Sequence, residues 1–397
     1  MSERFGVFFS YGFRPFFLAA GLYAVAGMAA WLAWIGLHAA AASVPAMSTG
    51  FPPYQWHAHE MLYEYTAAAV AGFLLTAVPS WTNRHPVAGA PLAALFGVWL
   101  LGRAAVWSSA FLPPLVVAIA DAAFLVFLFA LVLKSLIGGQ RRHFIFLGVL
   151  AVLIAGNVLV HLERLDLAVG TAAQGHLLAL DAVILLIATI GGRVGPAFTR
   201  NVLHRQGEAE PIPPRPWLDR ISVLSVLALL VADLGWSGGV AAGLLAALAA
   251  VANGIRLAGW RGLSVLDQPI LWIIHLGYAW LVVGLAAKAV ALLTGVMAEG
   301  TALHVLTVGA VGSMTLGIMT RAGLGHTGRP LKVAPAITAA YLILSFATVV
   351  RVLGPLWLPQ FYVAVLVTAG LAWCVAFGMY AWTYWPILTR PRVGSDG

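Results

Sequence analysis

About twelve stretches of roughly 20 mostly apolar residues follow one another along the chain, and this pattern strongly constrains its fold. In lipid, a helix of that length satisfies its own backbone hydrogen bonds. The composition agrees, because 61% of the 397 residues are apolar and only 9% are charged. We therefore predict an all-α membrane protein with spans near 16–38, 58–79, 91–108, 115–134, 144–162, 173–190, 217–237, 238–257, 270–293, 300–320, 334–354 and 361–383.

The distribution of basic residues predicts the orientation of these spans. With the N-terminus in the cytoplasm and the spans numbered in order, 18 of the 22 Lys and Arg residues fall on the termini and the even-numbered connections. This asymmetry follows the positive-inside rule and places both termini in the cytoplasm. It also accounts for the net charge of +8, so we expect a lipid bilayer as partner and no nucleic acid.

An internal repeat is indicated by three histidine–threonine pairs that share a spacing of 23 residues, His59–Thr82, His176–Thr199 and His304–Thr327. Pro79 and Pro196 both lie 20 residues after their histidines, and Gly72 and Gly317 both lie 13 residues after theirs. The joint pattern predicts one membrane domain, 1–397. Its related four-helix units, 1–143, 144–261 and 262–397, would form a pseudo-threefold 4+4+4 arrangement.

A second division of the chain stays open. The proline-rich connection from Gly191 to Pro216 separates six spans from six, which is typical of transporters built from two halves. Its motif GGRVGPAFTRN and the later motif MTRAGLGHTGRP combine glycine, proline and arginine. We interpret both motifs as helix ends with tight turns on the cytoplasmic side.

Five histidines near the outer ends of spans are candidate metal ligands, namely His57, His59, His161, His176 and His304. Neutral imidazole is a ligand suited to haem iron and to copper, and polar residues at membrane depth are costly. For a single histidine, simple placement at the interface is the competing interpretation. His57 and His59 diverge on a helix because they are two residues apart, so they can serve different centres.

Three carboxylates accompany these histidines. Glu60 and Glu64 share a helix face about one turn from His59, and Asp181 follows His176 by five residues. One interpretation is a carboxylate that orients a ligating histidine. The other is a proton relay to a redox centre, which requires these side chains to face the protein interior.

Three further residues determine how a haem could be held. Arg103 and Arg351 lie inside predicted spans, where they can extend toward the interface or pair with haem propionates. Cys374 is the only cysteine, which excludes a disulfide within the chain, a cysteine-ligated iron–sulfur cluster and a covalent Cys-x-x-Cys-His haem attachment. Any haem is therefore bound non-covalently.

Several long motifs resemble the NnrS family. In chain order they are FRPFFL, WHAHEMLYEYTAAAVAGFLLTAVPSWT, GGRVGPAFTRN, LGYAWL and ALHVLTVGAVGSMTLGIMTRAGLGHTGRPL, and they run from about Arg14 to Leu331. The resemblance implies a bacterial inner-membrane protein that carries haem b and copper. It also implies an association with denitrification and with protection against nitric oxide.

The repeat is similar to subunit I of haem–copper oxidases, which has twelve helices in three four-helix arcs and metal histidines on helices 2, 6, 7 and 10. This chain has no histidine in its seventh span, so a complete oxidase-type binuclear centre is not expected. If the architecture is shared, His59 and His304 are the haem axial pair. His57, His161 and His176 would then bind copper or a second haem.

Three functional hypotheses follow. The first is a haem-binding metalloprotein that handles nitric oxide or iron–nitrosyl species; as an oxidoreductase that removes nitric oxide, it would need a separate electron donor. The second is a transporter of a metal or metal–nitrosyl species that uses the histidines as transit ligands. The third is a haem-based sensor or assembly factor without turnover.

Overall fold

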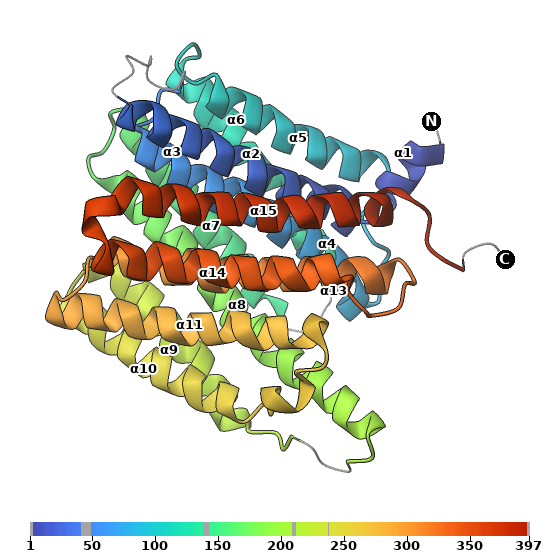
Figure 1. Ribbon diagram of the computed structural model, residues 1–397. Helices are drawn as coiled ribbons and strands as arrows, with labels where there is room; N and C mark the ends of the chain where they lie inside the picture. The colour runs from blue at the N-terminus through green and yellow to red at the C-terminus, as the bar shows by residue number, and fades with distance from the viewer. Residues whose placement is uncertain (1–2, 41–48, 138–142, 209–211, 237, 395–397) are drawn as a thin grey trace. The chain divides into compact units, whose positions relative to one another are not determined.

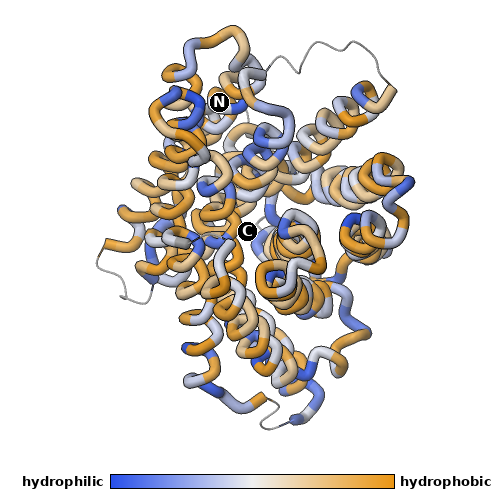
Figure 2. Tube along the Cα trace, turned by 90° about the vertical axis from the view of Figure 1, so that its left-hand side faces the viewer, coloured by the Kyte–Doolittle hydropathy of each residue, from blue (hydrophilic) through white to orange (hydrophobic). Residues whose placement is uncertain are grey.

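The computed structural model describes residues 3–40, 49–137, 143–208, 212–236 and 238–394. These residues form helices and contain no β-strand, which confirms the predicted all-α class. Eleven helices are long and apolar enough to cross a membrane, and hydrophobic residues dominate them (Figures 1 and 2). Arg141 and Arg142, which contribute to the charge asymmetry, lie outside the described residues.

The chain divides into two compact units. Unit 1 comprises Met1–Ala179, Ala322–Pro330 and Trp373–Gly397, and unit 2 comprises Leu180–Arg321 and Leu331–Ala372. Three helices contribute to both units: α8 (Thr171–Arg205), α13 (Ser313–His326) and α15 (Tyr362–Thr389). The other helices of unit 1 are α1 (Glu3–Phe8), α2 (Phe13–Ala39), α3 (Pro53–His59), η1 (Glu60–Thr66), α4 (Ala67–Thr82), α5 (Ala90–Trp107), α6 (Pro114–Leu136) and α7 (Ile145–Arg164). Those of unit 2 are α9 (Pro216–Trp236), α10 (Val240–Ala258), η3 (Gly262–Val265), α11 (Pro269–Thr294), α12 (Glu299–His304), η4 (Val305–Gly312), α14 (Pro335–Trp357) and η5 (Pro359–Phe361).

Helix α9 corresponds to the seventh predicted span but is not among the eleven apolar helices. It carries Asp219, Arg220 and Asp233 within its 21 residues, and such charges are costly in a lipid-spanning helix. Two of them have partners in unit 2: Asp219 pairs with Arg256 at 2.7 Å, and Asp233 pairs with Lys288. The chain therefore supplies opposite charges that compensate those of α9.

Local sequence signals explain many helix ends. Five α-helices start at a proline: Pro53, Pro114, Pro216, Pro269 and Pro335. Proline suits this position because the N–H that it lacks would have no partner in the first turn. Helix α4 ends at Asn83 with φ 52°, and α11 ends at Gly295 with φ 67°. Both residues tolerate the left-handed conformation that closes a helix.

The interpretation of GGRVGPAFTRN as a helix end is wrong, because α8 continues through this motif to Arg205. Pro196 has no N–H to bond to the carbonyl of Gly192, four residues earlier. Arg256 replaces that donor, since its Nη2 lies 3.1 Å from the oxygen of Gly192 and its Nη1 lies 2.7 Å from that of Ala188. A side chain from another helix thus allows the apolar span to run past its proline.

Two of the three proposed repeats share an unusual local structure. His59 and His304 each stand immediately before a π-helical segment, η1 and η4 respectively. Short π-helical segments are rare and occur frequently at functional sites. The matched threonines also behave alike, because each hydroxyl donates to the carbonyl four residues earlier: Thr82 to Val78, Thr199 to Gly195 and Thr327 to Gly323. Other helical threonines, such as Thr76 and Thr189, make the same bond, so the repeat and its threefold arrangement stay predictions.

A glycine contact between α7 and α8 sets their separation. A β-carbon at Gly175 would overlap the carbonyl oxygen of Gly156, and the carbonyl of Gly175 itself accepts a 2.6 Å hydrogen bond from the Tyr63 hydroxyl. We expect Gly175→Ala to lower the free energy of unfolding by about 1–3 kcal/mol, because the two helices must move apart. Denaturant unfolding of the purified protein measures this. The control is Gly148→Ala, whose β-carbon meets nothing within 4 Å, and an equal loss there would contradict the packing argument.

Candidate metal centre

In unit 1, buried polar side chains converge from three places in the sequence. His59 ends α3, Asp121 lies in the middle of α6, and His161 lies in the last turn of α7. Their exposed fractions are 0%, 2% and 3%. Polar groups buried this deeply are stable only when they bind one another, an ion or water.

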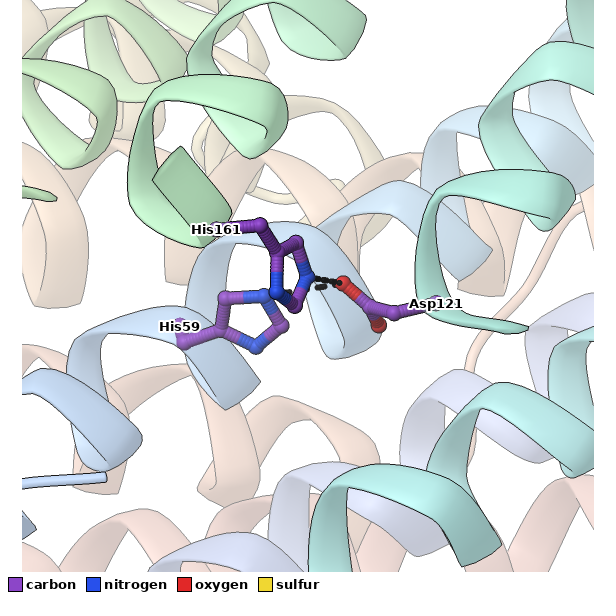
Figure 3. A group of neighbouring side chains, drawn as sticks. All are labelled: His59, Asp121 and His161. Atoms are coloured by element: carbon purple, nitrogen blue, oxygen red, sulfur yellow. Dashed lines mark hydrogen bonds and ion pairs between the residues drawn. The ribbon is translucent and has the colours of Figure 1, made fainter. Parts of the chain in front are cut away.

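The three side chains meet at one carboxylate oxygen. Oδ2 of Asp121 lies 3.1 Å from Nε2 of His59 and 2.8 Å from Nε2 of His161. Figure 3 shows both imidazole rings turned toward this carboxylate. One donor atom from each residue lies within 4.8 Å of the other two. Two imidazoles with one carboxylate form a donor set suited to iron, copper or zinc.

Asn157 on α7 supports this group, because its Nδ2 donates to the same oxygen of Asp121 at 2.8 Å. On the other side of Asp121, Arg103 of α5 binds Oδ1 of that carboxylate and also Glu64. Its Nη1 lies 2.7 Å from Oε1 of Glu60. Arg103 therefore joins three carboxylates that come from η1 and α6.

The charges of this cluster favour a bound cation. The carboxylates of Glu60, Glu64 and Asp121 bring three negative charges when ionised, and Arg103 supplies one positive charge. Oε2 of Glu60 and Oε2 of Glu64 are buried and have no hydrogen-bond partner among the described residues. An uncompensated negative charge in an apolar interior is costly, and it is neutralised either by protons on the carboxylates or by a divalent metal ion bound by these donors. The chemistry of the donors and their charge thus both fit a metal ion.

The other two candidate histidines of unit 1 lie differently. The ring of His176 is 6.3 Å from that of His59, and its Nε2 is buried without a hydrogen-bond partner among the described residues. His176 therefore borders the cluster with a nitrogen available for a ligand. The ring of His57 instead stacks on Trp31, with centroids 4.7 Å apart and planes 9° apart. The divergence expected for His57 and His59 is present.

The remaining candidates lie in unit 2. Nδ1 of His304 donates a hydrogen bond of 2.5 Å to the carbonyl of Gly300. Nε2 is then unprotonated, which is the tautomer that binds a metal through this nitrogen. Nη2 of Arg351 lies 3.2 Å from that Nε2. Asp181 is close to Lys288 of the same unit. Asp181 and His304 are therefore assigned to a different unit from Glu60 and His59.

The contacts distinguish a site for a small ion from a haem site. Both ring nitrogens of His59 are occupied, Nδ1 by Glu60 at 3.2 Å and Nε2 by Asp121 at 3.1 Å. Axial ligation of haem through His59 would require its Nε2 to leave Asp121, whereas an ion can bind to both groups at once. The same condition applies to His304, because Nη2 of Arg351 lies 3.2 Å from its Nε2, and a haem bound through this nitrogen would have to displace that contact.

Asp121 and Asn157 are the two residues of the centre that the sequence analysis missed. A usable signal exists for Asp121, because it is the only carboxylate in the 23 residues of α6. A carboxylate inside an apolar span is by default a functional candidate. Asn157 has a weaker signal, since an uncharged amide in a membrane helix often serves helix packing.

The family model described as NnrS protein matches residues 7–392. No curated protein matches the chain.

Proposed function

We propose, from the fact that the chain belongs to the NnrS family, that it is a metalloprotein of the bacterial inner membrane that handles nitric oxide or iron–nitrosyl species. Membership of this family supports a role in the nitric oxide response, and the eleven apolar helices make the chain a multi-pass membrane protein. In the proposal both termini are cytoplasmic and the protein protects against nitrosative stress. The observation that carries it is the buried His59–Asp121–His161 group.

The side chains of unit 1 take distinct roles in this proposal. His59, His161 and Asp121 hold a copper or non-haem iron ion, and His176 is a fourth candidate ligand. Such an ion, when bound, supplies a coordination position for nitric oxide. Arg103 and Asn157 fix the orientation of Asp121. Glu60 and Glu64, one on each side of Arg103, orient the ligands or carry protons toward the centre.

The proposal also includes haem b, which binds at a different residue. His304 is the proposed axial ligand, because the carbonyl of Gly300 fixes its ligating tautomer. Arg351, 3.2 Å from that imidazole, is the proposed partner of a propionate. His59 as the second axial ligand stays a prediction, and the contacts of His59 favour the ion site instead.

The test is metal analysis combined with visible spectroscopy. Protein purified in detergent after growth with haem precursor and copper is expected to contain a non-haem metal and a b-type haem whose bands move when nitric oxide is added. His304→Ala should remove the haem bands and leave the non-haem metal in place. Protein that contains neither group, and takes up neither on loading, would contradict the proposal.

A transporter is the second candidate function, and one observation favours it. Unit 2 contains three buried ionic side chains, Asp181, Asp233 and Lys288, in which the lysine pairs with both aspartates. Buried ion pairs of this kind mark ion pathways in many transporters. A transporter should move a labelled metal–nitrosyl complex into liposomes without added reductant, whereas a redox enzyme should act only when an electron donor is supplied.

A further inference from the structure

Unit 2 contains a group of three ionisable side chains inside its helices. Asp181 comes from α8, Asp233 from α9 and Lys288 from α11. Their exposed fractions are 1%, 0% and 0%. Nζ of Lys288 binds Oδ2 of Asp233 directly and lies 3.9 Å from Oδ1 of Asp181. Lys288 therefore pairs with two carboxylates and is in closer contact with that of Asp233.

Three oxygens of this group have no hydrogen-bond donor. They are both Oδ atoms of Asp181 and Oδ1 of Asp233, all buried and without a hydrogen-bond partner among the described residues. A carboxylate can only accept hydrogen bonds, whereas a protonated carboxyl also donates one. A proton on this pair would supply a donor that the described side chains lack.

Among the described residues, the ion pairs of unit 2 bring no other cation to this group. Glu299, half-buried at the start of α12, contributes further negative charge to the surroundings of Asp181. Other charged or titratable side chains of the packed elements have partners of their own. Arg256 of α10 binds Asp219, Arg351 of α14 binds His304, His275 of α11 binds Thr199, and Tyr278 of α11 binds Asn253. Arg220 of α9 is exposed.

Charge counting then determines the protonation of the group. Two carboxylates and one ammonium carry a net charge of −1 when all are ionised, and an excess charge inside a membrane helix bundle is costly. Neighbouring carboxylates relieve this cost by sharing one proton. With one proton the group is neutral.

We propose that Asp181, Asp233 and Lys288 form an intramembrane proton-binding site in which the two aspartates share one proton and Lys288 holds the remaining carboxylate. Because Lys288 contacts Asp233 more closely, the proton resides mainly on Asp181. Release of the proton leaves a carboxylate whose Oδ1 lies 3.9 Å from the ammonium, so the ionised form keeps an ionic partner. The inference deepens the relay role given to Asp181 and is independent of the metal centre in unit 1.

The experiment is infrared spectroscopy of the full-length protein with aspartate carboxyls labelled with ¹³C. At neutral pH the wild type should show a C=O band of a protonated carboxyl that moves with the label. Asp181→Asn and Asp233→Asn should each abolish it, because one carboxylate then pairs with Lys288 and no proton is needed. Lys288→Met should increase its area about twofold, because both aspartates must then be neutral.

Controls separate this site from the rest of the chain. Asp166→Asn changes an exposed aspartate and should leave the band unchanged. The metal content of the same samples tests the proposed centre in unit 1 independently. Either proposal can therefore be contradicted without the other. A wild type without a label-sensitive band overturns the inference, as does a band that persists in both asparagine variants. A band that appears only when sodium is replaced by choline would assign the site to Na⁺ and also overturn it.

Discussion

Replacing Arg103 with alanine is expected to lower the free energy of unfolding by about 3–5 kcal/mol, the usual cost of leaving buried charge without its partner. The guanidinium binds Glu60, Glu64 and Asp121, and these carboxylates are at most 2% exposed. Without Arg103 they repel one another in an apolar interior. Denaturant unfolding in detergent measures the loss, with Arg220→Ala, which removes an exposed arginine, as the control.

A rescue variant shows whether lost charge pairing or lost packing causes the instability of Arg103→Ala. Combining Arg103→Met with Glu60→Gln and Glu64→Gln removes one positive and two negative charges while it keeps side-chain volume similar. We expect this triple variant to recover a large part of the lost stability, since a buried ionic group can be replaced by neutral groups of similar size. If it is as unstable as Arg103→Ala, the repulsion argument is wrong.

Replacing His161 with alanine is expected to remove the non-haem metal while unit 1 stays folded. The imidazole supplies one of the three proposed ligands. Loss of a residue that only supports a ligand lowers metal affinity by roughly 10–100-fold, so loss of the ligand itself should lower it by at least as much. Stability should change less than in Arg103→Ala, because the contacts of Arg103 with Glu60, Glu64 and Asp121 remain. Mass-spectrometric metal analysis of the purified variant, with titration of the released ion, gives both quantities.

His143→Ala is the matched control for this prediction. His143 lies just before the other end of the same helix, α7, where its ring contacts those of Trp81 and Phe146. Its removal should leave the metal content unchanged. Full metal occupancy in His161→Ala and also in Asp121→Asn would refute the assignment of the centre.

The repeated spacing in the sequence corresponds to a shared local structure. His59 and His304 occupy equivalent places in the pattern, and both precede π-helical segments. The chemistry at the two places differs, because the positions after His59 include Glu60 and Glu64, whereas those after His304 are Val305 and Gly309. Arg103 therefore binds carboxylates, while Arg351 binds the imidazole of His304. The two places thus hold different polar groups.

The sequence by itself determined the helical membrane class, most of the spans, the family and several members of the centre. These properties depend on local information: the length of apolar runs, the distribution of positive charge, and neighbours such as Glu60 and Glu64 that share a helix face. The sequence did not determine how far α8 extends. Continuation past Pro196 depends on Arg256, which donates to the carbonyl that the proline leaves free.

Only the tertiary structure decided which polar residues meet. Asp121 binds His59 across 62 positions of sequence and His161 across 40. Lys288 binds Asp233 across 55. Helix packing creates these contacts, and no periodicity within one helix specifies which face of another helix it will meet. Burial in an apolar interior then makes each contact strong, because an unpaired charge there has no water to stabilise it.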